Sequence, residues 1–479
     1  MNKDREQWGS KIGFILAAAG SAVGLGNIWK FPSMAGENGG AAFTLVYLLC
    51  IFIVGLPILI AEFAIGRKTQ LNPFGAYRKL TQISQGKEDI ENPVEWKWVG
   101  FLGIVAAFSI LAFYNVVGGW TLRYTFVSLF GGFENFYNEG TPSADISELF
   151  FNDFIKSTWN PIFWHILFTG SCMLIILRGI KSGIEQWSKI MMPMIILILF
   201  LLAARGLTLQ GGTKALSFLF TPKFSDLTAS SIVLALGHSF FTLSLGMGTM
   251  ITYGSYLNKN QNLLTSALWI ILLDTGIALL AGVAIFATVF AVGANPAEGV
   301  GLIFIVLPTI FPQIGGGLIW GTLFFFILFM AALTSAISIL EVLTSYFIDE
   351  KGWTRKRATI TFGIIVGLVG VFSSLSLGNF SDFNIVFGIS LFDFFDMLSA
   401  KYLLPIGGLL CALFILFRFG IKSLLFEVKV GFNELNHKSP TVFMITTILF
   451  SLSSFIIALI IMNEVLEVFF NYSLLNFKH

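Results

Sequence analysis

Long apolar segments recur along the chain and limit what it can fold into. The hydropathy pattern predicts eleven of them, each close to the roughly 20 residues that an α-helix needs to cross a bilayer. We place these segments at 11–36, 41–66, 96–128, 161–178, 184–205, 229–256, 263–292, 318–348, 358–376, 392–417 and 441–463. Because 56% of the residues are hydrophobic and only 12% are charged, a water-soluble domain is excluded. The sequence predicts an all-α polytopic membrane protein.

Lysine and arginine are concentrated between alternate segments, which predicts the orientation. The basic residues on one side are Lys3, Arg5, Lys11, Arg67, Lys68, Arg78, Lys79, Arg178, Lys181, Lys189, Lys351, Arg355, Lys356, Arg357, Arg418, Lys422, Lys429 and Lys438. The opposite loops, at 131–157, 293–313 and 377–391, are poor in them. By the positive-inside rule, we expect a multi-pass protein of the plasma (cytoplasmic) membrane with a cytoplasmic amino terminus. An odd number of spans then puts the carboxyl terminus on the extracytoplasmic side.

Two of the apolar segments are interrupted by Gly, Asn, Ser and Thr, at 20–27 and at 240–248. Unpaired backbone groups in hydrocarbon cost several kcal/mol, so a helix breaks there only where protein, water or a ligand uses the freed groups. We therefore predict a solute site at these breaks. The alternative is that glycines such as Gly20 and Gly24 only let helices pack closely. That alternative leaves Asn27 and Ser244 unexplained.

The interrupted segments are the first and the sixth, so each opens a set of five. Five spans insert the second set upside down, and a pseudo-two-fold axis in the membrane plane would bring the two breaks together near the midplane. We expect two inverted five-span repeats, at 1–205 and 229–417, and an additional span at 441–463. Secondary transporters are built in this way.

The most specific motifs lie near the amino terminus. They are Arg5-Glu6-Gln7-Trp8, then Ala22-Val23-Gly24-Leu25-Gly26-Asn27-Ile28-Trp29-Lys30-Phe31-Pro32, then Glu37-Asn38-Gly39-Gly40. Further motifs are Gly55-Leu56-Pro57 with Glu62 and Gly66-Arg67, Tyr114, Trp120, the segment 240–256, and Leu333-Thr334-Ser335 with Asp349-Glu350. Together they resemble the neurotransmitter:sodium symporter family, in particular its bacterial amino-acid transporter branch. The resemblance implies a 5+5 inverted-repeat, leucine-transporter-like fold with discontinuous spans 1 and 6, and a sodium-coupled symporter that works by alternating access and is not an enzyme.

The resemblance also implies two sodium sites. Sodium is a hard cation that takes about five or six oxygen ligands, which broken helices supply as carbonyls. The first site would use the carbonyls of Ala22 and Thr242, the Thr242 hydroxyl, the Asn27 amide and Asp274. The second would use the carbonyls of Gly20, Val23 and Ala331 and the hydroxyls of Thr334 and Ser335. The last three residues share one helical face by their spacing, although both hydroxyls are equally compatible with bonding back to their own helix.

Asp274 lies in an otherwise apolar span, where a carboxylate costs several kcal/mol unless a cation or a proton compensates it. By resemblance, it stands where the family usually has an asparagine sodium ligand. Members that require chloride carry neutral residues in this region, and the anion supplies the missing charge. One carboxylate here could bind sodium and replace chloride, so we expect no chloride requirement. Whether Asp274 titrates in the cycle stays open.

Gly24 restricts the class of substrate that we expect, because monoamine carriers of the family have an Asp at this position that binds the amine. An amino acid brings its own carboxylate, which can bind the N–H groups of Leu25 and Gly26 at a half-helix start. The substrate-binding residues implied by resemblance are Ala22, Gly24, Leu25, Gly26, Ile110, Tyr114, Phe241, Thr242, Ser244, Met247, Ser335 and Ile339. Met247 is flexible and suits aromatic as well as branched side chains. We expect a hydrophobic or aromatic amino acid, with tyrosine, tryptophan, phenylalanine and leucine as candidates.

Alternating access requires a gate on each side and a movable element. Lys30 and Asp396 would form a water-mediated outer gate. The predicted inner gate consists of Arg5 and Asp349, with Trp8, Ser255 and Tyr256 packed around them. In the fifth span, Gly183 and Pro193 form the family's Gly-x9-Pro hinge, because both weaken the helix. The alternative is a Pro-kinked packing helix.

Other buried polar residues carry weaker signals. We expect Glu62 and Glu341 to tie broken backbone or neighbouring helices together rather than to move protons, and His238 to be packed rather than to bind a metal. The chain has no P-loop, and nothing points to nucleic acid. Its expected partners are a small-molecule amino acid and the lipid bilayer, and the oligomeric state is left open. A sodium-dependent amino-acid receptor or a channel without concentrative transport remains the alternative function, and an intramembrane protease is disfavoured because Asp274 lacks an obvious partner.

Overall fold

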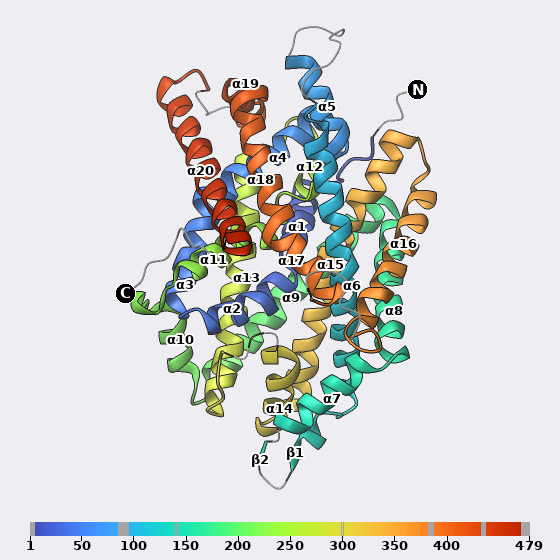
Figure 1. Cartoon of the computed structure of the whole chain (residues 1–479), viewed down its shortest axis with the longest axis vertical. Helices are drawn as coiled ribbons and strands as arrows, with labels where there is room; N and C mark the ends of the chain where they lie inside the picture. Colours follow the sequence, from blue (N-terminus) through green and yellow to red (C-terminus); the bar gives the residue numbers. More distant parts are fainter. Residues whose placement is uncertain are drawn as a thin grey trace.

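The computed structural model describes residues 5–84, 95–138, 141–142, 144–297, 299, 301–381, 388–432 and 437–470. Helices make up nearly all of this part of the chain (Figure 1). The described residues also include one short antiparallel pair, β1 (Tyr137–Asn138) and β2 (Thr141–Pro142), in which Tyr137 pairs with Pro142. The predicted all-α class is confirmed.

The first half of the chain contains the first five predicted spans. Its helical elements are α1 (Lys11–Ala22), η1 (Gly26–Lys30), α2 (Phe31–Glu37), α3 (Ala41–Cys50), η2 (Ile51–Gly55), α4 (Leu56–Thr69), α5 (Pro73–Ser84), α6 (Lys97–Leu129), η3 (Glu134–Phe136), α7 (Ala144–Lys156), α8 (Trp159–Ile176), η4 (Ile180–Glu185) and α9 (Gln186–Leu207). Helices η1, η2 and η4 are π-helical turns inside longer spans.

The second half contains the remaining predicted spans. Its elements are α10 (Gly212–Phe220), η5 (Phe224–Asp226), α11 (Ala229–Thr242), α12 (Thr249–Gly254), α13 (Leu263–Ala291), η6 (Leu302–Val306), α14 (Leu307–Ile310), η7 (Phe311–Gln313), α15 (Gly317–Lys351), α16 (Arg355–Leu375), α17 (Leu391–Met397), η8 (Leu398–Leu403), α18 (Leu404–Phe414), η9 (Ile415–Phe419), α19 (Ile421–Lys429) and α20 (Pro440–Phe470).

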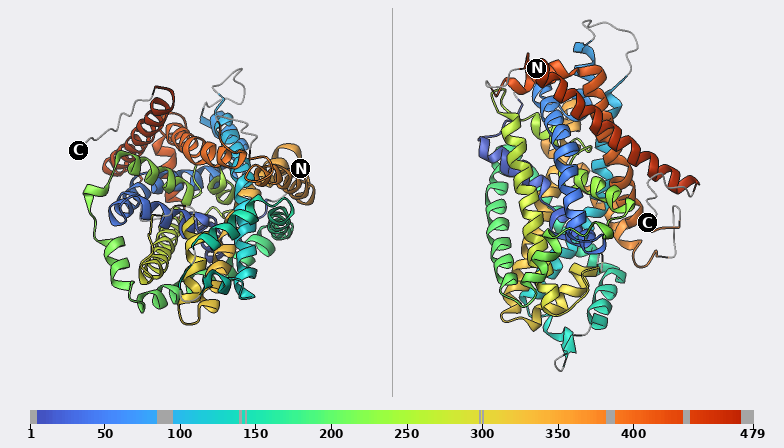
Figure 2. Two further views of the ribbon diagram at one scale, coloured as in Figure 1. Left: turned by 60° about the horizontal axis from the view of Figure 1, so that its bottom comes forward. Right: turned by 90° about the vertical axis from the view of Figure 1, so that its left-hand side faces the viewer.

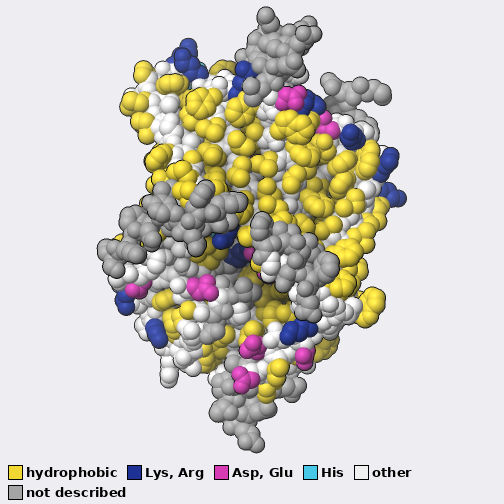
Figure 3. Space-filling model, in the orientation of Figure 1, with side chains coloured by type: hydrophobic (Ala, Val, Ile, Leu, Met, Phe, Trp, Pro, Cys, Tyr) yellow, Lys and Arg dark blue, Asp and Glu magenta, His cyan; other side chains and the backbone are white. Residues whose placement is uncertain are grey.

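Within the described residues, nine helices are long and apolar enough to cross a membrane, and α1 with η1 and α2 forms a tenth span that bends by 48°. The predicted sixth span consists of α11 and α12, which are too short to qualify on their own. A broad band of hydrophobic side chains covers the visible face (Figure 3). The protein is therefore a multi-pass membrane protein, and the exact count of eleven spans stays a prediction.

The spans differ in how deeply they are buried. In the most apolar stretches of α6 and α15, 78% and 83% of the residues are buried, against 28% in α20. Helices α6 and α15 pack on each other, and α1 packs on α9, α13 and α15 (Figure 1). Helix α20 lies along the periphery in both views of Figure 2. The core of the molecule thus contains α6 and α15, with the first broken span packed against α15, and α20 is an outer addition.

The helix ends correct several sequence-based expectations. Helix α1 continues through Gly20 to Ala22, so the first break is shorter than the predicted 20–27. The predicted outer loop at 131–157 contains helix α7, which was missed because a short amphipathic helix has no membrane-span signal. Parts of the predicted loops, namely 139–140, 143, 298, 300 and 382–387, lie outside the described residues.

Candidate functional site

The first break lies between α1 and η1. Helix α1 ends at Ala22, and the next residue, Val23, has the extended conformation φ −73°, ψ 101°. The N–H of Gly24 does not complete a helical bond to Gly20; it donates to the Asn27 side-chain oxygen over 3.1 Å. The carbonyl of Gly20 thus loses its usual helical donor, although the residue itself is helical. The first break therefore lies within the predicted segment 20–27, but it begins at Val23 and not at Gly20.

The second break lies between α11 and α12 and is longer. Helix α11 ends at Thr242, and residues 243–248 are not helical. Ser244, Gly246 and Gly248 have φ values of 53°, 78° and 77°, a backbone conformation that glycine adopts readily and serine rarely does. Glu62 stabilises this segment, because its carboxylate accepts from the Gly246 N–H over 2.8 Å. The expectation that Glu62 ties broken backbone together is supported by this contact.

The two breaks meet at Ser21. Its carbonyl accepts hydrogen bonds from the hydroxyls of Ser244 and Ser335, both over 2.9 Å. Its own hydroxyl lies 3.2 Å from that of Ser244 and 2.7 Å from that of Ser338. All four side chains are buried. Sequence reasoning missed Ser21 and Ser338, whose only signal was a hydroxyl in an apolar span.

Asp274 faces the two breaks from α13. Its Oδ1 accepts from the Asn27 amide over 2.7 Å and from the Thr242 hydroxyl over 2.9 Å. Asp274 is fully buried, and its Oδ2 has no hydrogen-bond partner within the described part of the chain. Two of the predicted ligands of the first sodium site, Asn27 and Thr242, are therefore gathered around a third, the buried Asp274 carboxylate, and no basic side chain pairs with that carboxylate among the described residues. Such a group needs a cation or a proton.

The predicted face of α15 also points at the first break. The Thr334 hydroxyl lies 3.4 Å from the Val23 carbonyl and 3.0 Å from that of Ala331 in its own helix. The Thr334 hydroxyl therefore contacts a carbonyl of its own helix and a carbonyl of the first break. Ser335 bonds across to α1 instead, so the back-bonding alternative is wrong for this residue.

Tyr114 closes the space beside Gly24. Its hydroxyl accepts from the Leu25 N–H over 3.1 Å. A Cβ placed on Gly24 would lie 2.6 Å from that hydroxyl and 3.0 Å from Ser335 Oγ, so only glycine fits. The ring of Phe241 lies 6.5 Å from that of Tyr114 and covers Gly26. Of the other predicted pocket residues, Ile110, Met247 and Ile339 are buried in the core, and their contact with a substrate stays a prediction.

The predicted outer pair is in direct contact. Lys30 Nζ lies 2.5 Å from Asp396 Oδ1 and 4.5 Å from the centre of the Phe241 ring. The expected bridging water is therefore wrong in this conformation. The long, flexible lysine stem reaches the carboxylate by itself.

The predicted inner pair forms as well. The Arg5 guanidinium donates to both oxygens of Asp349 over 2.7 and 2.8 Å and to the Ser255 hydroxyl over 2.7 Å. It also lies 4.7 Å from the centre of the Tyr256 ring. Trp8 packs edge-on against Tyr253 and Tyr256. Both of the predicted gate pairs are therefore formed, and their role as gates stays a prediction.

A second ionic group behind the inner gate was missed. Arg355 donates to Glu341 over 2.7 Å and to Glu6 over 3.0 Å, and the Tyr256 hydroxyl donates to Glu341 over 2.6 Å. Glu341 ties neighbouring helices together, as expected. Its partners were not predictable, because Tyr256 lies 85 residues away and Arg355 lies on a separate helix.

The predicted hinge region forms hydrogen bonds to the residues that immediately precede α1. Glu185, two residues after Gly183, accepts from the Gly9 N–H over 2.5 Å and from the Ser10 hydroxyl over 2.9 Å. It also accepts from Lys189 over 2.5 Å, one turn before Pro193. Gly183 lies in the π-helical turn η4, and Pro193 lies inside α9. Span 5 is therefore irregular at the predicted place, and its irregular turn holds the amino-terminal segment.

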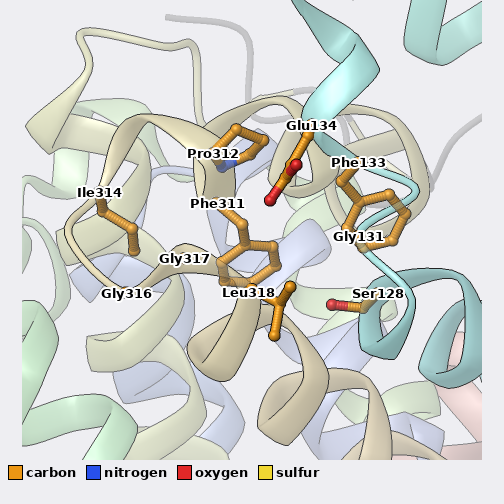
Figure 4. Close-up of a pocket in the computed structure, with 10 residues that line it drawn as sticks. All are labelled: Ser128, Gly131, Phe133, Glu134, Phe311, Pro312, Ile314, Gly316, Gly317 and Leu318. Atoms are coloured by element: carbon orange, nitrogen blue, oxygen red, sulfur yellow. The ribbon is translucent and has the colours of Figure 1, made fainter.

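One cavity lies away from the breaks. It measures about 400 Å³ and lies between the end of α6 and the turn that precedes α15. Its wall is mostly apolar, and the Glu134 carboxylate points into it (Figure 4). None of the predicted site residues lines it. The candidate site is therefore the closed region at the two breaks and not this cavity.

Comparisons with known proteins agree with this geometry. The model of the sodium:neurotransmitter symporter family matches residues 5–141 and 143–477. An uncharacterised sodium-dependent transporter of Bacillus subtilis, YhdH, is 40% identical over 427 residues, which are 89% of this chain and 91% of that protein. Another from Haemophilus influenzae is 34% identical over 417 residues, 86% of this chain and 89% of that protein.

A solved structure matches over nearly the whole chain. The crystal structure of MhsT in complex with L-phenylalanine has 42% sequence identity and a TM-score of 0.84, and the match covers 95% of this chain and 100% of that chain. The leucine-transporter-like fold is thereby confirmed, and sodium dependence agrees with the names of the relatives. The chain belongs to the sodium:neurotransmitter symporter family.

Proposed function

We propose that this protein is a sodium-coupled symporter of hydrophobic and aromatic amino acids that works by alternating access and does not require chloride. The observation that carries the proposal is the buried Asp274 carboxylate, bonded to Asn27 and Thr242 at the point where the two breaks meet. A carboxylate in that position binds a hard cation and supplies the negative charge that chloride would otherwise bring.

In this proposal, sodium is a co-substrate bound at two sites. The first site takes the carbonyls of Ala22 and Thr242, the Thr242 hydroxyl, the Asn27 amide and Asp274. The second takes the carbonyls of Gly20, Val23 and Ala331 and the hydroxyls of Thr334 and Ser335. The second set is supported by the closeness of α1 and α15, since a Cβ on Gly20 would lie 3.3 Å from Thr334. Sodium there would replace the hydrogen bond from Thr334 to Val23.

The substrate carboxylate would bind at the start of η1 and complete the shell of the first sodium. The N–H groups of Leu25 and Gly26 and the Tyr114 hydroxyl supply donors there. Because the first sodium and the substrate share this contact, each raises the affinity for the other. The absence of a side chain at Gly24 favours an amino acid over an amine without a carboxylate, and the phenylalanine complex of MhsT supports an aromatic side chain.

The two repeats, 1–205 and 229–417, would rock against each other, with the 441–463 span outside them. Opening would separate Lys30 from Asp396 on one side, or Arg5 and Trp8 from Asp349 and Tyr256 on the other. The Lys30–Asp396 pair is partly solvated and contributes about 1 kcal/mol or less, which is compatible with a gate that opens in every cycle. Lysine and arginine side chains gather at the end of the molecule that carries α5 and α19 (Figure 3), which supports a cytoplasmic amino terminus.

Uptake into proteoliposomes tests the proposal. An inward sodium gradient should drive accumulation of radiolabelled phenylalanine, potassium should not replace sodium, and unlabelled tryptophan, tyrosine or leucine should compete. Replacing chloride by gluconate should leave the rate unchanged, and a collapse of uptake would contradict the chloride-independent mechanism. Sodium-dependent binding without accumulation would favour the receptor or channel alternative.

A further inference from the structure

Helix α19 packs on α4 and α20 and has two unlike faces (Figure 1). Its buried face is formed by Ile421, Leu424, Leu425, Glu427 and Val428. Its other face carries Lys422, Phe426 and Lys429, which follow one another at i, i+4 and i+7 and therefore share one side of the helix. Lys422 is exposed, and the Phe426 side chain is 53% exposed. An amphipathic helix with lysines beside an exposed ring is typical of a membrane–water interface.

Helix α19 is anchored to the end of α4 through its buried face. The Arg67 side chain, which is fully buried, donates to the Glu427 carboxylate over 2.8 Å and also to the backbone carbonyls of Glu427 and Gln261. Lys68, the next residue of α4, lies 3.6 Å from the other oxygen of the Glu427 carboxylate. These contacts hold the helix in one orientation, with its lysines on the outer side.

Three lysines around α19 have no acidic partner in the described part of the chain. Lys422 and Lys429 lie on the helix, and Lys438 follows His437, whose ring lies 6.0 Å from that of Phe426. Among the described residues, no carboxylate comes within ion-pair distance of any of the three lysines. Charges of one sign on one surface repel each other unless an anion approaches them. The surface therefore favours an anionic partner.

Exposed apolar side chains lie directly beside these lysines. Phe443 and Met444, near the start of the α20 span, are 37% and 55% exposed. Lys422 Nζ lies 5.9 Å from the centre of the Phe443 ring. Lys68 Nζ lies 5.9 Å from the centre of the Phe426 ring. Figure 3 shows basic side chains next to hydrophobic ones at this end of the molecule. Ammonium groups beside exposed rings match the boundary between the phosphate of a phospholipid and its acyl chains.

We propose that this surface binds an anionic phospholipid. We call it the α19 surface and define it by Lys68, Lys422, Lys429, Lys438, Phe426 and Phe443. The lysines bind the negatively charged headgroup, and the two rings contact the acyl chains. A zwitterionic phospholipid binds less well because its own ammonium group is repelled by the lysines. A soluble anion is disfavoured because the exposed rings would stay in water.

The proposed cytoplasmic amino terminus places the α19 surface at the cytoplasmic leaflet, where anionic lipids attract basic residues. Only this assignment to a leaflet rests on the proposed function. The binding itself depends on the lysines and the rings, so it can be measured on the purified protein without sodium or an amino acid.

Native mass spectrometry of the purified protein measures the binding. The protein is titrated with phosphatidylglycerol and, in parallel, with phosphatidylcholine that carries the same acyl chains. Because each basic residue near a membrane surface contributes about fivefold to the binding of anionic lipid, Lys422→Gln together with Lys429→Gln should weaken the tightest phosphatidylglycerol site about 25-fold. Replacing both lysines by arginine should keep the affinity within about twofold, because guanidinium also binds phosphate. Phosphatidylcholine should bind more weakly to the wild type.

The matched control is Lys351→Gln together with Lys356→Gln, which removes two exposed lysines at the junction of α15 and α16. It lowers the net charge equally, but it should weaken phosphatidylglycerol binding less than about twofold, because distant exposed charges are screened by salt. Equal weakening in the two glutamine double variants would overturn the proposal, since net charge alone would then be the cause. Unchanged binding after the loss of Lys422 and Lys429, or equal affinity for the two lipids, would overturn it as well.

Hydrogen–deuterium exchange in lipid nanodiscs provides a second test. The amides of residues 421–430 should exchange more slowly in phosphatidylglycerol than in phosphatidylcholine, and those of residues 144–156 in α7 should not differ. Equal exchange of residues 421–430 in the two lipids would refute the proposal. Equal protection from glycerol 3-phosphate added to phosphatidylcholine nanodiscs would also refute it, because a soluble anion would then suffice. A protein that fails to transport amino acids still gives both readouts, so failure of the proposed function is distinguished from failure of lipid binding.

Discussion

Replacing Glu185 by alanine should release the amino-terminal segment from span 5 without unfolding the protein. The side chain is 2% exposed and holds Gly9 and Ser10 through two hydrogen bonds to a charged acceptor. Such bonds contribute about 1.5–3 kcal/mol each. Gly9 and Ser10 are exposed and can bond to water after the substitution, so the lower value applies. The pair with Lys189 adds at most about 1 kcal/mol, because that lysine is 41% exposed.

The two bonds together stabilise the closed segment by about 2–3 kcal/mol, which corresponds to roughly 30- to 150-fold in the opening equilibrium. Hydrogen–deuterium exchange with mass spectrometry measures this directly. In Glu185→Ala, the amides of residues 9–13 should exchange faster by that factor in sodium, where the wild type is closed. Glu148→Ala removes an exposed carboxylate on α7 and is the matched control.

The same substitution tests the hinge. If Gly183 and Pro193 form a movable element, losing the two hydrogen bonds of Glu185 should speed the amide exchange of residues 9–13. The amide exchange of residues 194–207 should stay unchanged. An acceleration of less than threefold at residues 9–13 would refute the reasoning from the two hydrogen bonds. Faster exchange along all of α9 would mean that Glu185 stabilises the helix itself.

Three further substitutions test the site. Gly24→Ala should weaken sodium-dependent amino-acid binding more than tenfold, because its Cβ would lie 2.6 Å from the Tyr114 hydroxyl; unchanged affinity in an equilibrium binding assay would contradict this packing. Asp274→Asn should weaken sodium binding at least tenfold and make the remaining uptake faster in chloride than in gluconate, and equal rates in the two anions would argue against charge replacement. Lys30→Arg should change the apparent substrate affinity less than about fivefold, because a partly exposed ion pair contributes at most about 1 kcal/mol. A larger change in uptake kinetics would show that Lys30 has a role beyond its ion pair with Asp396.

Much of the fold followed from the sequence because hydropathy and helix breaks are local properties. The apolar runs predicted the described spans to within a few residues, apart from the sixth, whose two helices are individually too short to register as a span. The glycines and serine at 243–248 predicted the longer break well, since their backbone angles are those that ordinary residues avoid. The first break was placed too early, because the small residues Gly20, Ser21 and Ala22 are equally compatible with a helix end and with helix packing.

The sequence by itself therefore determined the membrane-spanning class, the two broken spans and, through its motifs, the residues at which sodium and an amino acid are proposed to bind. Only the tertiary structure decided which of these residues meet. It brought Ser21 onto the second break and Glu185 onto Gly9 and Ser10. The physical reason is that hydropathy and backbone preference act between residues close in the chain, whereas these contacts depend on how separate helices pack around one buried charge.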